Sequence, residues 1–123
     1  MAFLIPVLIL LVLYIGRGIF PFGDNTYLRS DMYHQYAPFM KEFQRNIQTG
    51  GSLLYSWNIG LGTNLASTYA YYLASPANWL VGLFPDTLVP EFMNLMLILK
   101  SGAMSAVFAW YLIRTFRRND YIA

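Results

Sequence analysis

The chain has 123 residues, of which 57% are hydrophobic and 11% are charged. Soluble domains carry about 25% charged residues, so the composition predicts an integral membrane chain that has the lipid bilayer as its main partner. The net charge of +2 and the dispersed basic residues argue against nucleic acid as a partner. Cysteine is absent, which excludes disulfides and thiolate metal sites. Because so short a chain holds few membrane spans, we expect a fragment of a larger membrane protein.

The first predicted element is a transmembrane helix within residues 1–22, because residues 2–20 are almost wholly apolar until Arg17. About 20 such residues cross a hydrocarbon core of roughly 30 Å. A secretory signal peptide is the competing interpretation. The sequence argues against it, since no basic region precedes the apolar residues and no small-x-small cleavage site follows them.

Residues 23–91 form a predicted extracytoplasmic loop, and its first part holds a group of polar side chains. Asp31, His34 and Gln35 are spaced at i, i+3 and i+4, so a helix would point all three the same way. Asp24 is the other acid that follows the first span. In the simpler interpretation Asp31 only caps a helix that begins at Met32, and His34 is a hydrogen-bonding loop residue.

An amphipathic helix is predicted over residues 38–49. Pro38 suits the first helical turn, and the Gly-Gly pair at 50–51 suits the end. The polar residues, Glu42 and Gln44 among them, fall away from the apolar side. That side holds Phe39, Met40, Phe43 and Ile47. We therefore expect this helix to lie on the bilayer surface.

No charged residue occurs between Arg45 and Asp86, yet aromatic and amide side chains are frequent there. Gly60 and Gly62 argue against regular structure in the Asn-rich run at 57–64. The aromatic and amide side chains suit either contact with a sugar or an aromatic belt at the membrane interface. The residues in question are Trp57, Asn58, Asn64, Tyr71, Tyr72 and Trp79.

Residues 65–84 are predicted to be an interfacial segment. A third span is the alternative, and the positions of the basic residues do not decide between the two. Six Leu, Val or Phe residues contribute roughly −2 to −4 kcal/mol on the insertion scale, against several hydroxyl, amide and tyrosine side chains and a Ser-Pro break at 75–76. Insertion is therefore unfavourable.

The second predicted span covers residues 92–113, and a basic end, residues 114–123, follows it. Arg114, Arg117 and Arg118 place that end in the cytoplasm under the positive-inside rule. Two spans then put both termini inside the cell. Rows of small residues in the span allow close contact with partner helices of the full protein. These rows are Ser101, Ser105 and Ala109, with Gly102 and Ala106.

Lys100 falls inside the second predicted span. A lysine at a helix centre costs roughly 2.5–3.5 kcal/mol on insertion scales, so a compensating partner is expected. That partner is a lipid-carrier phosphate or an acid from another helix. The competing interpretation places Lys100 near the outer interface, where its ammonium reaches water.

Four ordered motifs carry a resemblance to a known family. They are Phe-Gly-Asp at 22–24, Ser-Asp-Met-Tyr-His-Gln-Tyr-Ala-Pro-Phe at 30–39, Ser-Trp-Asn-Ile-Gly-Leu-Gly-Thr-Asn at 56–64 and Tyr-Tyr-Leu-Ala-Ser-Pro-Ala-Asn-Trp-Leu at 71–80. With them the chain resembles the N-terminal region of the YfhO family of bacterial membrane proteins. That family is similar to the GT-C glycosyltransferases, which take a sugar from a polyprenyl-phosphate carrier. Its members are far longer and have many spans.

The resemblance implies a catalytic aspartate in the first outer loop, and Asp31 fits that place. His34, Gln35 and Asp24 would support it, and Lys100 would bind the donor phosphate. The spacing of Asp24 and Asp31 is not the adjacent acid pair of some GT-C enzymes, so a metal role is left open. Carboxylates and phosphate oxygens could hold Mg²⁺ or Mn²⁺, whereas neither haem nor a nucleotide is expected.

The sequence thus predicts an all-α membrane protein with two transmembrane helices joined by a long extracytoplasmic loop. The function implied by the resemblance is sugar transfer by the parent protein from a polyprenyl-phosphate donor to a cell-envelope acceptor such as lipoteichoic acid, in the bacterial cell membrane. Its partners would be that donor and the remaining transmembrane helices. The alternative is a transporter or assembly subunit without catalysis.

Overall fold

The computed structural model describes residues 1–116, which are mostly helical and form two compact units. Unit 1 comprises Met1–Tyr27 together with the chain from Asn94 onwards, and unit 2 comprises Leu28–Met93. The predicted basic end is only partly described, since Arg117 and Arg118 lie outside residues 1–116.

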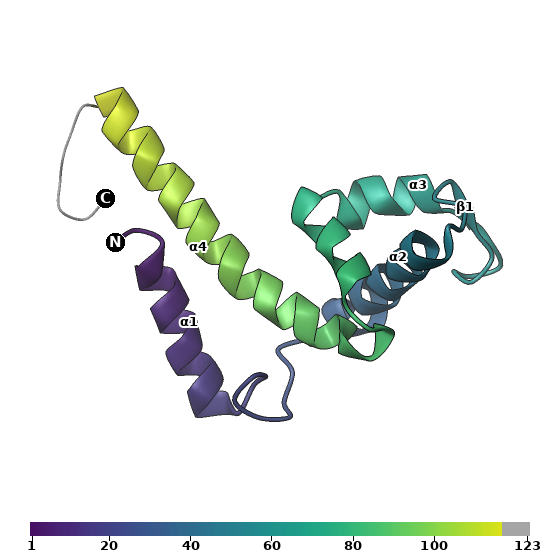
Figure 1. The fold of residues 1–123 in the computed structure, drawn as a ribbon, viewed down its shortest axis with the longest axis horizontal. Coiled ribbons are helices and arrows are strands. Elements are labelled where there is room, and N and C mark those ends of the chain that lie inside the picture. The colour runs from purple at the N-terminus through teal and green to yellow at the C-terminus, as the bar shows by residue number, and fades with distance from the viewer. Residues whose placement is uncertain (117–123) are drawn as a thin grey trace. The chain divides into compact units, whose positions relative to one another are not determined.

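Two helices make up unit 1, α1 (Leu4–Arg17) and most of α4 (Val89–Phe116), and they lie side by side (Figure 1). Their contact is largely apolar: Tyr14, Ile19 and Ile98 form a buried cluster against which Val7, Leu10 and Leu11 pack. The Tyr14 hydroxyl donates a hydrogen bond to the Asn94 carbonyl oxygen, 3.1 Å away. Burial of apolar side chains therefore holds this helix pair together.

Gly102 of α4 packs closely against the start of the chain. A Cβ atom at this position would lie 2.7 Å from Cγ2 of Val7 and 2.8 Å from Cε2 of Phe3. Only a residue without a side chain leaves room for such an approach. One of the small residues noted in the sequence thus permits close contact with α1.

The described helices differ from the predicted spans in length. α1 has 14 residues and ends at Gly18, which adopts a left-handed conformation with φ 59°. At 1.5 Å per residue it is about 21 Å long, short of the roughly 30 Å hydrocarbon core, so the predicted helix at 2–20 extends too far at both ends. Among the described residues one helix, Asp86–Phe116, is long and apolar enough to cross a membrane. The two-span topology stays a prediction.

Unit 2 is built around α2 (Ala37–Thr49), which continues directly from the π-helical turn η1 (Met32–Tyr36). The helix ends at Gly50, whose φ of 67° suits glycine. Its bounds agree with the predicted 38–49 within one residue. The surroundings of α2 differ from the predicted position on the bilayer surface, because Glu42 and Gln44 are buried together with Met40 and Phe43. A helix lying only on a bilayer surface would leave those polar side chains in water.

Gln44 shows how α2 is covered. Its Nε2 donates to the carbonyl oxygens of Val81, at 2.9 Å, and Phe84, at 2.7 Å. Val81 belongs to the 3₁₀ helix η3 (Pro76–Leu83), and Phe84 follows it. The polar side of α2 therefore packs against a segment some forty residues further along the chain (Figure 1).

A short antiparallel hairpin follows α2 and was not expected. Strand β1 (Tyr55–Ser56) pairs with β2 (Thr63–Asn64), with Tyr55 opposite Asn64. The connecting residues contain Gly60 and Gly62, whose φ values are 62° and 108°. Residues with side chains rarely adopt these conformations, so the glycines allow the chain to reverse where the sequence suggested irregular structure.

Residues 65–84 form three short helical segments in the structure. They are α3 (Leu65–Thr68), the π-helical turn η2 (Tyr69–Leu73) and η3. The break between η2 and η3 lies at the Ser-Pro pair, where the Asn78 Nδ2 donates to the Leu73 carbonyl oxygen at 3.1 Å. No helix of spanning length runs through this segment of the described chain. A further short turn, η4 (Asp86–Leu88), leads into α4.

Candidate functional site

The predicted catalytic residue, Asp31, lies at the first turn of the helix that leads into α2. The preceding residue, Ser30, has a φ of 48°, and it is the one residue other than glycine with positive φ in the described chain. The Ser30 carbonyl oxygen accepts hydrogen bonds from the N–H groups of Tyr33 and His34. A left-handed conformation costs a residue with a side chain about 1–3 kcal/mol, and such strain clusters at functional sites.

The Asp31 side chain is exposed and does not cap the helix. Asp31 itself has helical dihedral angles, φ −59° and ψ −33°, and its carboxylate accepts no capping hydrogen bond. An N-cap residue normally has extended dihedral angles and bonds the N–H two or three residues later. The capping interpretation of this aspartate is therefore not supported, and its carboxylate is open to solvent or a ligand.

The helix after Asp31 begins with a π-helical turn, η1. Its backbone bonds join residues i and i+5 instead of i and i+4, so the spacing of an α-helix does not apply through His34 and Gln35. Both are exposed, and no described hydrogen bond joins either to Asp31. Their contacts go elsewhere: Gln35 Oε1 accepts from the Tyr72 hydroxyl at 3.4 Å, and the His34 ring meets Tyr33 edge to face.

The predicted aromatic and amide contacts fall into two groups. Tyr72 is packed, with its ring 5.0 Å from both Tyr36 and Phe39. Trp57 and Tyr71 remain largely exposed, at 76% and 80% of their surface. These two are available to a lipid interface or a partner, whereas Tyr72 holds the η1 turn against η2.

Asn64 and Trp79 have structural partners. The Asn64 Oδ1 accepts from the Ser67 N–H at 3.1 Å and so caps α3. The Trp79 Nε1–H donates to the Tyr69 hydroxyl at 2.9 Å, and its ring meets Phe43 at 5.2 Å. Asn64 therefore stabilises the start of α3, and Trp79 packs η3 against α2.

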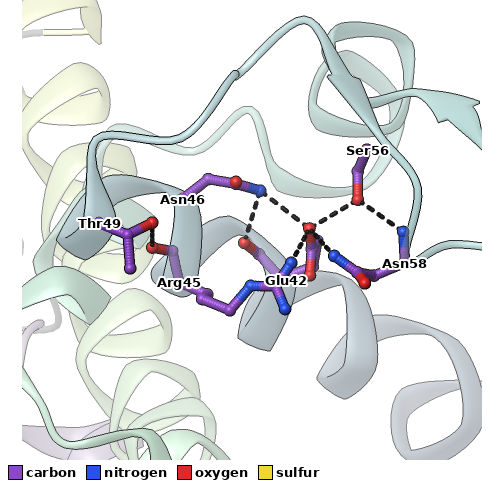
Figure 2. Close-up of polar contacts among 6 residues, drawn as sticks. All are labelled: Glu42, Arg45, Asn46, Thr49, Ser56 and Asn58. Atoms are coloured by element: carbon purple, nitrogen blue, oxygen red, sulfur yellow. Dashed lines mark hydrogen bonds and ion pairs between the residues drawn. The ribbon is translucent and has the colours of Figure 1, made fainter.

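Glu42 is a buried acid whose role could not be read from the sequence. Its side chain is only 8% exposed, and its Oε1 accepts four hydrogen bonds (Figure 2). The donors are Ser56 Oγ at 2.6 Å, Arg45 Nη2 at 3.0 Å, Asn46 Nδ2 at 3.0 Å and Asn58 Nδ2 at 3.1 Å. Hydrogen bonds to a charged group contribute about 1.5–3 kcal/mol each, so this carboxylate joins α2 to the hairpin.

A pocket of about 540 Å³ opens beside this carboxylate within unit 2. Its charged side chains are Lys41, Glu42, Arg45 and Asp86, and Lys41 Nζ lies 3.3 Å from Asp86 Oδ2. Pro38, Phe39, Gln48, Asn58, Ile59 and Gly60 complete the lining. The pocket combines paired charges, amides and an aromatic ring.

The remaining predicted site residues, Asp24 and Lys100, belong to unit 1, whereas Asp31 belongs to unit 2. Asp24 is exposed in the turn after α1, and Lys100 is half-buried in α4. In residues 1–116 no group of three or more His, Asp or Glu side chains could hold a metal ion. The supporting roles of both residues stay predictions.

A comparison with protein families adds to these observations. The model of the family described as "Bacterial membrane protein YfhO" matches residues 1–123, the whole chain given. The chain belongs to the YfhO family. The YfhO resemblance inferred from the four motifs is therefore confirmed, and with it the assignment to a bacterial membrane.

No curated protein and no solved structure matched this YfhO chain. The family description names a membrane location and no reaction. Asp31 and the Glu42 pocket are the two places in unit 2 where the structure presents a carboxylate with ligand access.

Proposed function

We propose that this chain is the N-terminal part of a membrane glycosyltransferase that transfers a sugar from a polyprenyl-phosphate donor to a cell-envelope acceptor such as lipoteichoic acid. Membership in the YfhO family and its resemblance to GT-C enzymes support the proposal. The observation that carries it is the exposed, uncapped carboxylate of Asp31 beside the left-handed Ser30. Asp31 is the residue that the resemblance marks as catalytic.

The proposed role of Asp31 is that of a general base. An acceptor hydroxyl is a poor nucleophile until a carboxylate takes its proton, and such catalysis contributes about 10²–10⁴ in rate. The acceptor oxygen then forms a bond to the anomeric carbon while the bond to the carrier phosphate breaks, and the phosphate leaves with its electron pair. One displacement of this kind inverts the anomeric centre.

Electrostatics suit this assignment. The leaving phosphate carries the negative charge that the broken bond releases, so a cation near it lowers the barrier. We propose this role for Lys100, a half-buried residue of α4. Trp57 and Tyr71 are exposed aromatic side chains that would contact the sugar or the lipid interface.

The test is the full-length protein that carries Asp31→Asn, assayed with a polyprenyl-phosphate sugar and a membrane acceptor. We expect transfer to fall by at least the ~10² of a lost general base, with unchanged membrane insertion, because Asn is isosteric and Asp31 makes no capping bond. Asp24→Asn is the matched control, and it should reduce transfer less or recover with added Mg²⁺ or Mn²⁺.

Two results contradict the proposal. If the Asp31→Asn protein transfers sugar at the wild-type rate, Asp31 is not the base. If wild-type protein neither transfers nor hydrolyses the donor, but moves a solute or is needed to assemble another complex, the transporter or assembly alternative holds.

A further inference from the structure

We infer that the pocket beside Glu42 is a binding site for a neutral sugar. The inference deepens the proposed function and rests on it for the choice of ligand. The pocket lies wholly within unit 2, between α2, the hairpin loop and η4. Its volume of about 540 Å³ falls in the range of roughly 300–1,000 Å³ typical of small-molecule sites.

The two carboxylate oxygens of Glu42 differ in their hydrogen bonds. All four described hydrogen bonds to this side chain end on Oε1 (Figure 2). Oε2 receives no hydrogen bond from the described residues, although the side chain is 8% exposed and lines the pocket. Among the described residues, the buried side-chain oxygens without a hydrogen-bond partner are Gln44 Oε1 and Glu91 Oε2. Glu42 Oε2 is instead accessible, so it is an acceptor open to a ligand hydroxyl.

The Glu42 carboxylate is held rigidly by its hydrogen-bond donors. Ser56 and Asn58 come from the hairpin, while Arg45 and Asn46 come from α2. Donors from both elements fix the Glu42 carboxylate before any ligand arrives. A preorganised acceptor loses little conformational freedom on binding, which is the property expected of a recognition residue.

The charges that line the pocket indicate which class of ligand it binds. Two cations and two anions line the pocket, and each cation lies beside an anion: Lys41 with Asp86 at 3.3 Å and Arg45 with Glu42 at 3.0 Å. A phosphate would need an excess of positive charge, which this pocket lacks. Alternating donors and acceptors instead suit the hydroxyls of a neutral sugar, which both donate and accept.

The apolar residues that line the pocket also suit a neutral sugar. Phe39, Pro38 and Ile59 present carbon atoms next to the polar group. A sugar ring offers C–H groups on its faces and hydroxyls at its edge, so it contacts both kinds of surface at once. The ligand is the sugar of the lipid-linked donor or a sugar unit of the acceptor, since both share this chemistry.

Two variants separate recognition from folding. In Glu42→Gln the amide oxygen can take the place of Oε1 and keep its four donors, while an NH₂ group replaces the acceptor Oε2. Asp86→Trp blocks the pocket from its rim, where the Asp86 side chain is 62% exposed, and leaves the buried bonds intact. Glu91→Gln is the control for the loss of a carboxylate, because Glu91 has a buried Oε2 without a partner among the described residues and does not line the pocket.

The measurement is binding of methyl glucoside, methyl galactoside and N-acetylglucosamine to the purified full-length protein in detergent, by saturation-transfer NMR. We expect at least one sugar to bind wild type and Glu91→Gln alike. Glu42→Gln and Asp86→Trp should each weaken binding at least tenfold, and inorganic phosphate should not compete. No sugar binding to wild type, equal binding to both pocket variants, or competition by phosphate would overturn the inference.

Transfer kinetics of Asp86→Trp then identify the source of the sugar. A rise in KM for the lipid-linked donor alone assigns the pocket to the donor sugar, and a rise in KM for the acceptor alone assigns it to the acceptor. If neither KM changes, the pocket is not a sugar subsite of the reaction. Sugar binding without any transfer by wild type contradicts the glycosyltransferase proposal and leaves the pocket inference in place.

Discussion

The two units of this protein are held together by different interactions. In unit 1, α1 and α4 pack through an apolar cluster around Tyr14 and Ile98, and Gly102 of α4 lies close to Val7 and Phe3. In unit 2, buried polar side chains join segments far apart in sequence, as Gln44 does with Val81. A hydrophobic helix pair can form wherever two apolar faces meet. Unit 2 instead depends on particular donors meeting particular acceptors, which fixes a single arrangement of its loops.

This difference explains where the candidate sites lie. Buried polar groups must be satisfied, and their positions are therefore well defined. The exposed carboxylate of Asp31 and the fixed carboxylate of Glu42 both belong to unit 2. Both proposed sites therefore lie in the segment between the two hydrophobic helices.

The largest stability effect is expected at Gln44. In Gln44→Ala the Val81 carbonyl oxygen loses its buried donor, the Phe84 carbonyl oxygen keeps only its bond from Gln48, and a void remains. Unfolding should therefore become easier by about 2–4 kcal/mol. Gln48→Ala is the matched control, because Gln48 donates to the same Phe84 carbonyl oxygen from an exposed position. Water can replace that bond, so the change should stay within about 0.5 kcal/mol.

Thermal unfolding of the purified chain in detergent, followed by circular dichroism, measures both Gln variants. Equal destabilisation by Gln44→Ala and Gln48→Ala would mean that the buried position of Gln44 carries no extra weight. Buried polar contacts would then not be what holds unit 2 together.

A smaller effect is expected in unit 1. Gly102→Leu places a side chain where Val7 and Phe3 already lie within 3 Å of a Cβ position. Overpacking costs about 1–3 kcal/mol, whereas replacing a helical glycine stabilises the helix by roughly 1 kcal/mol. The free energy of unfolding should therefore fall by up to about 2 kcal/mol. Gly16→Leu is the control, since nothing lies within 4 Å of a Cβ there.

Gly102→Leu and Gly16→Leu are compared by the same unfolding measurement. A Gly102→Leu protein as stable as Gly16→Leu would show that close helix approach does not stabilise unit 1.

The smallest effect is expected at the surface ion pair. Lys41 and Asp86 are 57% and 62% exposed, so their 3.3 Å contact is screened by water and salt. Lys41→Ala should change the unfolding free energy by about 0–1 kcal/mol. A loss above 2 kcal/mol, measured at high and low salt, would contradict this assignment and place Lys41 among the groups that hold unit 2 together.

Sequence patterns located several elements because their signals are local. The amphipathic repeat with Pro38 and the glycines at 50–51 predicted a helix at 38–49, and α2 covers Ala37–Thr49. The apolar run before Arg114 predicted a long helix, and Asp86–Phe116 contains it. α1 was predicted too long, because hydrophobicity continues past Gly18 while the backbone turns there.

The sequence also predicted a catalytic role for Asp31 through a motif. The structure shows that its side chain is exposed, and the role stays a prediction. The sequence placed Asp31, His34 and Gln35 on one helical face, but the π-helical turn η1 changes that spacing. The spacing of hydrophobic residues does not indicate where backbone hydrogen bonds change from i, i+4 to i, i+5 pairing. The left-handed Ser30 was hidden for the same reason, since serine gives no signal of positive φ.

By itself the sequence determined the membrane class, the family and the main helices, because hydrophobicity, helix ends and short motifs are properties of neighbouring residues. Only the tertiary structure decided that Glu42 and Gln44 are buried, that Ser56 and Asn58 meet Glu42, and that a pocket opens beside that carboxylate. The physical reason is separation along the chain. Glu42 and Gln44 have partners that lie 14–40 residues away in the hairpin and around η3. A polar side chain shows whether it is solvated or satisfied only once its distant partner is in place.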